Sequence, residues 1–181
     1  MKLTVKPLDK KKHNRQSFDC GLPVVNGFLQ EQASRQMAQK INRTWVLTGQ
    51  AKETADPLPI IGYYTLTNAT IVRGELPAQE PKGRFPGYPL PVYKLAWIGV
   101  DSEYQNTGLF IGETLLMEAL EQACSLSEHS GLGIAVVTDP LTERSEQFFR
   151  KYGFLSMGRP FRDRDSLYLP MTTVKKLILS Q

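Results

Sequence analysis

The sequence contains few of the residues that build metal sites and disulfide frameworks. Among its 181 residues there are two cysteines, Cys20 and Cys124, and two histidines, His13 and His129. Two cysteines this far apart make neither a disulfide scaffold nor a metal-ligand motif, so we predict that the chain carries no metal. Neither cysteine has the motif partner that would mark a nucleophile, and we expect both histidines to lie at the surface.

Long apolar runs are missing as well. No stretch approaches the roughly 20 consecutive apolar residues that a membrane span requires, and the basic N-terminus (MKLTVKPLDKKKHNRQ) lacks the apolar region of a secretory signal. Hydrophobic residues make up 41% of the chain and charged residues 22%, which are ordinary values for a globular domain. We therefore expect a soluble cytoplasmic protein that has no membrane partner.

The chain also lacks internal repeats and low-complexity tracts. Its most irregular segment, residues 75–91, contains five prolines and two glycines and is predicted to be a loop, because proline blocks helices and central strands. A separate domain on either side of this loop would end in strands without partners. A length of 181 residues suits one ordinary domain, so residues 1–181 are predicted to form a single one.

The net charge of +4 is modest, and part of the excess is concentrated in two clusters. The basic residues of these clusters are Lys10, Lys11, Lys12 and Arg15 near the N-terminus, and Arg159, Arg162 and Arg164 near the C-terminus. Such clusters are either ordinary solvated surface or the electrostatic footprint of a polyanion such as nucleic acid. Composition does not decide between these two interpretations.

Hydrophobic periodicity predicts an alternation of strands and helices. Apolar residues at three- and four-residue spacing favour one helix after Gly21 and another around residues 115–123, and a third helix is expected over 141–153. Strands are predicted over 3–5, 43–49, 58–72, 92–100, 131–139, 154–157 and 166–171, with a turn at 50–57. We expect an α/β (α+β) fold with a single mixed, mostly antiparallel sheet of about six or seven strands and helices on both faces.

The segment IGVDSEYQNTGLFIGETLL (98–116) has the features of an anion-binding turn. A buried strand ends at Val100, a polar turn follows, and Gly108 and Gly112 accompany the start of an amphipathic helix. Glycine permits close approach of the backbone, and a helix N-terminus presents unpaired N–H groups at the positive end of its dipole. This arrangement suits a pyrophosphate, although it matches neither the P-loop nor the Rossmann glycine pattern.

The same segment resembles the GNAT superfamily of N-acetyltransferases, in which Gln/Arg-x-x-Gly-x-Gly/Ala between a strand and a helix holds the pyrophosphate of coenzyme A. The matching residues run from Gln105 to Gly108. The later Tyr-Gly-Phe that ends at Phe154 is similar to the end of the family's next helix. SFDCGLPVVNGFLQEQASRQ, the strand start at residues 42–44 and IIGYYTL resemble the branch of GNAT toxins that is paired with ribbon-helix-helix antitoxins.

The resemblance implies the GNAT fold and acetyl-CoA as the acetyl donor. It places the cofactor on the strand end and the loop, at Ile98, Gly99, Val100, Gln105, Asn106, Thr107, Gly108, Leu109, Ile111, Gly112 and Glu113. Phe110 stands where the family has its second small residue, so we expect a longer loop and a helix that starts near Ile111. The resemblance also implies a homodimer, a ribbon-helix-helix antitoxin as partner and aminoacyl-tRNA as acceptor.

The usual general acid of the family is replaced in this sequence. The family commonly has a tyrosine, whose hydroxyl protonates the departing thiolate, at the position of Phe149. Tyr152, about one helical turn further along, is the candidate substitute, with packing at the helix end as its alternative role; Ser145 is a weaker candidate. A single general acid contributes about 100- to 10,000-fold, so its loss slows acetyl transfer without abolishing it.

The expected acceptor is an α-amine. An α-amino group has a pKa of roughly 7.7 to 8.0, against about 10.4 for a lysine side chain, so it loses its proton readily at neutral pH. Aromatic residues that either line an acceptor pocket or pack in the core are Trp45, Trp97, Tyr63 and Tyr64. Candidates for phosphate contacts are Arg15, Arg43, Arg84 and the Arg159–Arg164 cluster. Two alternatives stay open: a GNAT acting on a small-molecule or protein amine, and a catalytically weakened member that binds coenzyme A.

Overall fold

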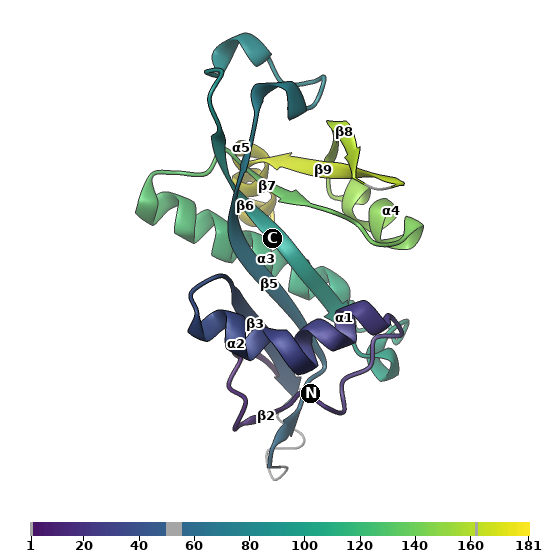
Figure 1. Cartoon of the computed structure of the whole chain (residues 1–181). Helices are drawn as coiled ribbons and strands as arrows, with labels where there is room; N and C mark the ends of the chain where they lie inside the picture. The colour runs from purple at the N-terminus through teal and green to yellow at the C-terminus, as the bar shows by residue number, and fades with distance from the viewer. Residues whose placement is uncertain (1, 50–55, 162) are drawn as a thin grey trace. The chain divides into compact units, whose positions relative to one another are not determined.

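The computed structural model describes residues 2–49, 56–161 and 163–181 (Figure 1). Their contacts divide the chain into two compact units, one within residues 1–67 and 97–119 and the other within 68–96 and 120–181. Strands β5 (Gly62–Ile71) and β6 (Leu90–Val100) and helix α3 (Ile111–Ser130) each contribute residues to both units. The assignment of residues 1–181 to a single domain stays a prediction.

The strands of the first unit are built around β3. Strand β3 (Arg43–Gly49) has the predicted bounds, because its β-branched and aromatic residues suit a buried strand. It pairs antiparallel with β1 (Leu3–Pro7) on one side and with β5 on the other. The short strands β2 (His13–Asn14) and β4 (Leu58–Pro59) pair parallel in a separate ladder. Residues 50–55 of the predicted turn lie outside the described residues.

The helix expected after Gly21 is present, but it is not uniform. It consists of α1 (Pro23–Gly27), a π-helical turn (Phe28–Gln32) and α2 (Ala33–Ala38). Pro23 occupies the first turn, where a missing N–H has no consequence. In the π turn the Ala33 N–H donates to the Phe28 carbonyl, five residues earlier, which periodicity of apolar residues does not reveal.

Aromatic residues contribute several stacked pairs to the core of the first unit. Tyr63 is completely buried and its hydroxyl donates to the Val25 carbonyl at 2.7 Å, which ties β5 to α1. The Phe28 and Trp97 rings stack at 4.7 Å, and Trp45 stacks on Tyr64 at 5.2 Å. These four aromatic candidates therefore pack against neighbours in the core, which is the second of the two roles expected for them.

The second unit contains the remaining strands and two helices. Strand β7 (Ala135–Thr138) pairs parallel with β6 and antiparallel with β9 (Arg164–Pro170), which pairs antiparallel with β8 (Leu155–Phe161). Helix α4 (Glu143–Lys151) is shorter at both ends than predicted, and α5 (Met171–Leu179) was not predicted at all. The loop expected over 75–91 gives way to β6 at Leu90 and contains the 3₁₀ turn Lys82–Arg84; another such turn spans Arg73–Glu75.

The seven strands follow the order β1-β3-β5-β6-β7-β9-β8. Strand β6 pairs parallel with β7, whereas the pairs β1–β3, β3–β5, β7–β9 and β8–β9 are antiparallel. The prediction of a mixed, mostly antiparallel sheet of six or seven strands is therefore confirmed. In the described part of the chain, no helix combines the length and apolar character needed to cross a bilayer.

Replacing Gly62 by alanine tests the close packing of β5. A Cβ there would lie 2.6 Å from Leu115 Cδ1 and 3.0 Å from the Gly99 carbonyl oxygen, which belongs to the backbone. We expect Gly62→Ala to lower the free energy of unfolding by about 1–3 kcal/mol, as overpacking does. Gly27→Ala is the matched control, because no atom lies within 4 Å of its new Cβ; alanine should stabilise this helical position by about 0.5–1 kcal/mol. Urea unfolding measures both, and equal effects would contradict the packing described.

Candidate cofactor site after strand β6

The turn that follows β6 is fixed by hydrogen bonds to Asp19. The Asp19 N–H donates to Asp101 Oδ2 at 3.0 Å, and the Ser102 N–H and hydroxyl both donate to the Asp19 carbonyl at 2.8 Å. Asp101 Oδ1 accepts the Glu103 N–H at 3.0 Å and so caps the 3₁₀ turn Ser102–Tyr104. Sequence analysis missed these residues, although an aspartate directly before a turn is a recognisable capping signal.

Gln105 holds the start of the loop from the inside. Its Nε2 donates to the Val100 carbonyl at 2.8 Å and to the Cys20 carbonyl at 3.0 Å. The side chain therefore links the end of β6 to the segment before α1. Gln105 is one of the predicted cofactor residues. Because its amide nitrogen already donates to two protein carbonyls, the side chain stabilises the loop.

Residues 106–110 form an exposed loop with an unusual backbone. Asn106, Gly108 and Phe110 have φ values of 56°, 75° and 50°, so every second residue is in the left-handed region. Residues that alternate in this way turn successive N–H groups toward one side and create a concave site for anions. The whole loop is solvent-exposed, and Phe110 is 68% exposed, so its ring extends into solvent.

Helix α3 begins at Ile111, as predicted. The Phe110 carbonyl accepts the Thr114 N–H at 3.0 Å, which starts the helical hydrogen-bond pattern. The N–H groups of the first turn, which contains Gly112 and Glu113, lie at the positive end of the helix dipole. Ile111 itself is 2% exposed, so its side chain belongs to the interior and its backbone is the part that can serve a ligand.

The last part of β6 extends beyond its ladder with β7. The pairing of β6 with β7 ends at Leu95 with Thr138, where the Thr138 hydroxyl also donates to the Leu95 carbonyl at 2.9 Å. Ile98, Gly99 and Val100 lie past this point. At Gly99 the backbone packs so closely against α1 that a Cβ would lie 2.9 Å from Val25 Cγ1, which explains why glycine is needed there.

Helix α4 carries the candidates for the general acid. Phe149 is 2% exposed and packs against Phe154 at 5.4 Å. The Ser145 hydroxyl is engaged at the helix N-terminus, where it donates to the Thr142 carbonyl at 2.9 Å and accepts the Thr142 N–H at 3.0 Å. Tyr152 is half-buried at the C-terminal end, with its ring 5.4 Å from that of Phe148.

The expectation that both histidines lie at the surface is wrong for His13. His13 is 5% exposed, whereas His129 is exposed as expected. Arg15 donates to the Gln30 carbonyl at 3.1 Å, and Arg164 pairs with Glu146 at 3.6 Å, so part of each guanidinium is already engaged by the protein.

The remaining candidates are distributed as follows. The Arg43 guanidinium lies 5.6 Å from the centre of the Trp45 ring, and the 3₁₀ turn Lys82–Arg84 carries Arg84 at an exposed position. The side chains of Arg159 and Arg162 lie outside the described residues.

Burial raises the pKa of both cysteine thiols, so neither is activated. The described residues contain no group of three or more side chains able to hold a metal ion.

The chain is similar to known toxins over nearly its whole length. No family model matches it. A Sinorhizobium fredii protein described as "Probable toxin TacT" is 25% identical in an alignment 185 residues long, which covers 98% of this chain and 96% of that one. AtaT complexed with acetyl-methionyl-tRNAfMet has a TM-score of 0.82 at 26% identity, over 97% of this chain and 99% of that one.

A second solved structure carries the cofactor and the antitoxin. It is a tyrosine-to-phenylalanine mutant of the AtaT toxin, bound to the C-terminus of the antitoxin AtaR and to acetyl-CoA. Its TM-score is 0.76 at 26% identity, over 99% of each chain. The fold similarity therefore extends across both units of the structure described above.

Replacing Gly108 by alanine tests the loop geometry. Its φ of 75° disfavours any residue with a Cβ, while no atom lies within 4 Å to clash. We expect Gly108→Ala to lower the free energy of unfolding by about 1–2 kcal/mol, the cost of a left-handed conformation, and to weaken acetyl-CoA binding in calorimetry. Gly87→Ala is the control, because Gly87 is equally uncrowded but lacks a positive φ. Unchanged acetyl-CoA affinity in Gly108→Ala would contradict a role of the loop in binding.

Proposed function

We propose that this chain, whose homologues are GNAT-type toxins such as TacT and AtaT, is an acetyl-CoA-dependent N-acetyltransferase that acetylates the amino group of aminoacyl-tRNA. The main structural support for this proposal is the exposed loop 106–110, which has alternating left-handed residues and leads into the N-terminus of α3. This arrangement suits a pyrophosphate. The AtaT structure with bound acetyl-CoA, which covers 99% of this chain, supports acetyl-CoA as the molecule that carries this pyrophosphate.

The cofactor is assigned to two backbone segments. The pyrophosphate is bound by N–H groups of Asn106–Leu109 and of Ile111–Glu113, while Gln105 positions the loop. Ile98, Gly99 and Val100 hold the pantetheine arm and the thioester oxygen through backbone groups beyond the β7 ladder. Preorganised donors at a developing oxyanion typically contribute about 100- to 1000-fold in rate.

The acceptor and the partners follow from the relatives. The acetyl-methionyl-tRNAfMet bound to AtaT is an acetylated aminoacyl-tRNA, which supports the α-amine of a charged tRNA as the acceptor. The antitoxin segment bound to AtaT supports an antitoxin partner for this chain, and we assign it to the ribbon-helix-helix type. The protein acts in the cytoplasm as a homodimer in this proposal.

Tyr152 is the proposed general acid. The attacking neutral amine forms the amide bond to the acetyl carbon and gives up one proton, while the carbon–sulfur bond breaks and the departing thiolate takes a proton from the Tyr152 hydroxyl; the proton lost by the amine balances the one that Tyr152 gives. Phe149 has no hydroxyl to give, and the Ser145 hydroxyl is engaged in the capping box of α4. Tyr152 is the remaining hydroxyl among the α4 candidates, and its half-buried position leaves part of its side chain accessible.

Transfer of labelled acetyl groups tests the function. The purified protein is incubated with radiolabelled acetyl-CoA and total charged tRNA, and label is expected in RNA that carries N-acetylaminoacyl groups. Deacylated tRNA is the control and should take up none, because it lacks the amine. Label in small-molecule or protein amines alone, or acetyl-CoA binding without any transfer, would contradict the proposal.

The Tyr152→Phe variant tests the general acid. We expect kcat to fall by about 100-fold or more, in the range of a lost general acid, with KM for both substrates unchanged. Tyr88→Phe is the matched control, because Tyr88 is 70% exposed and far from α4 in sequence; its kcat should not change. An unaltered kcat in Tyr152→Phe would remove Tyr152 from the mechanism.

A further inference from the structure

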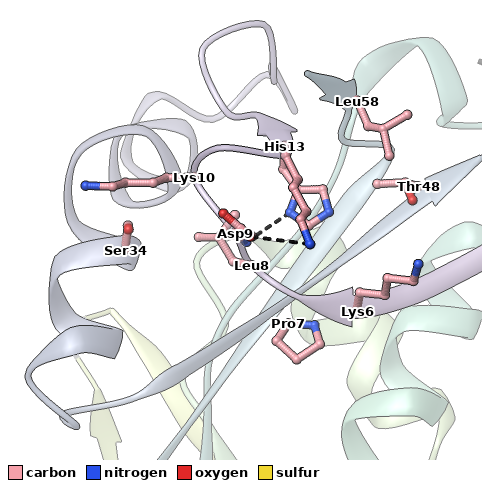
Figure 2. A pocket seen from close by; sticks show the side chains of 10 residues that line it. Lys6, Pro7, Leu8, Asp9, Lys10, His13, Ser34, Thr48 and Leu58 are labelled. Atoms are coloured by element: carbon pink, nitrogen blue, oxygen red, sulfur yellow. Dashed lines mark hydrogen bonds and ion pairs between the residues drawn. The ribbon is translucent and has the colours of Figure 1, made fainter. Parts of the chain in front are cut away.

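The first unit contains a pocket that the proposed acetyl-transfer chemistry does not use. It has a volume of about 550 Å³ and is lined by the end of β1, the turn that follows it, β2, and single residues of α2, β3 and β4 (Figure 2). Its lining residues are Lys6, Pro7, Leu8, Asp9, Lys10, Lys12, His13, Ser34, Thr48 and Leu58. None of them belongs to β6, to the loop 105–110 or to α3, so the pocket is separate from the proposed cofactor residues.

The charge of the pocket is predominantly positive. Lys6, Lys10 and Lys12 line it, and Asp9 is its one carboxylate. Asp9 is committed to protein groups, since its Oδ1 accepts the Lys11 N–H at 2.9 Å and its Oδ2 lies 3.9 Å from Lys12 Nζ. Lys6 and Lys10 extend in different directions from the chain (Figure 2).

His13 adds a fixed hydrogen-bond donor. Its Nδ1 accepts the Asp9 N–H at 3.0 Å, so the neutral ring carries its proton on Nε2. Burial lowers the pKa of His13, which keeps the ring neutral at pH 7. With Nδ1 occupied, the remaining donor of this pocket-lining ring is Nε2–H.

The lining therefore offers mainly donors. Besides the lysines and His13, it contains the hydroxyls of Ser34 and Thr48. A phosphate group, which has several acceptor oxygens and a negative charge, is the ligand that satisfies such a set. We infer that this pocket binds a backbone phosphate of the tRNA acceptor, an inference that rests on the proposed function.

Two features favour RNA over the phosphates of acetyl-CoA. The loop 105–110 and the start of α3 already provide backbone N–H groups for the pyrophosphate of the cofactor. The pocket instead presents lysines, whose long flexible side chains carry a compact charge and contact phosphates without reading sequence. Contacts of this kind raise the affinity for any RNA and position its acceptor end.

A triple variant tests the pocket in the full-length protein. Lys6→Gln, Lys10→Gln and Lys12→Gln are combined, because these exposed side chains leave the burial of His13 unchanged. The control combines Lys40→Gln, Lys82→Gln and Lys176→Gln, which remove the same charge from exposed positions outside the pocket. The measurements are KM for charged tRNA, KM for acetyl-CoA, and binding of deacylated tRNA at several salt concentrations.

The expected result separates the two sources of phosphate. In the pocket variant KM for charged tRNA should rise about tenfold or more, KM for acetyl-CoA should not change, and the salt slope of tRNA binding should fall by about one, since the loss of one phosphate contact removes about 0.7–0.9. The control variant should shift these values much less. A raised KM for acetyl-CoA, or equal effects in both variants, overturns the inference.

The test also separates this inference from the proposed function. If the unaltered protein acetylates no charged tRNA, the proposed function fails, and the binding of deacylated tRNA still measures the pocket. If acetylation proceeds and the pocket variant binds tRNA like the unaltered protein, the inference about the pocket fails alone.

Discussion

The cofactor loop depends on hydrogen bonds between the turn after β6 and the segment before α1. Asp19 with Asp101 and Cys20 with Gln105 are joined over 82 and 85 residues of sequence. A loop in which every second residue has a left-handed φ is costly to hold open, because residues other than glycine lose about 1–2 kcal/mol there. The bonds at Gln105 and the helix that begins at Ile111 fix both of its ends, so the strained backbone between them keeps one arrangement.

The parts of the structure that the sequence predicts are those with local causes. Strand β3 follows from a run of β-branched and aromatic residues, and the start of α3 follows from the glycine-rich turn before it. Helix α5 was missed although Met171, Val174 and Ile178 have helical spacing, since its first residue had been assigned to the preceding strand. The burial of His13 could not be predicted, because its strand pairs with Leu58, 45 residues later in the chain, and no local pattern of the sequence reveals that pairing.

The proposed cofactor site and the proposed tRNA pocket differ in the same way. The cofactor loop offers backbone N–H groups, whose direction is fixed by the fold and which suit one ligand in one orientation. The proposed tRNA pocket offers lysine ammonium groups, which move with their side chains and suit a ligand recognised by charge. The sequence shows the basic cluster but not which of its members face a ligand. Arg15 belongs to the cluster, yet its guanidinium donates to the Gln30 carbonyl.

The packing of α4 explains how the tyrosine usual in the family can be absent. Phe149 is enclosed by Phe148 and Phe154, so the position serves the core of the second unit, whereas Tyr152 stands at the helix end with its side chain partly accessible. A thiol with a pKa of about 8.5 is a fair leaving group, and an α-amine of about 7.7–8.0 needs little deprotonation at neutral pH. The reaction with charged tRNA therefore asks less of acid–base groups than acetylation of a lysine does. Positioning of the two substrates can then carry most of the rate, which fits a structure that fixes its cofactor loop so firmly at both ends.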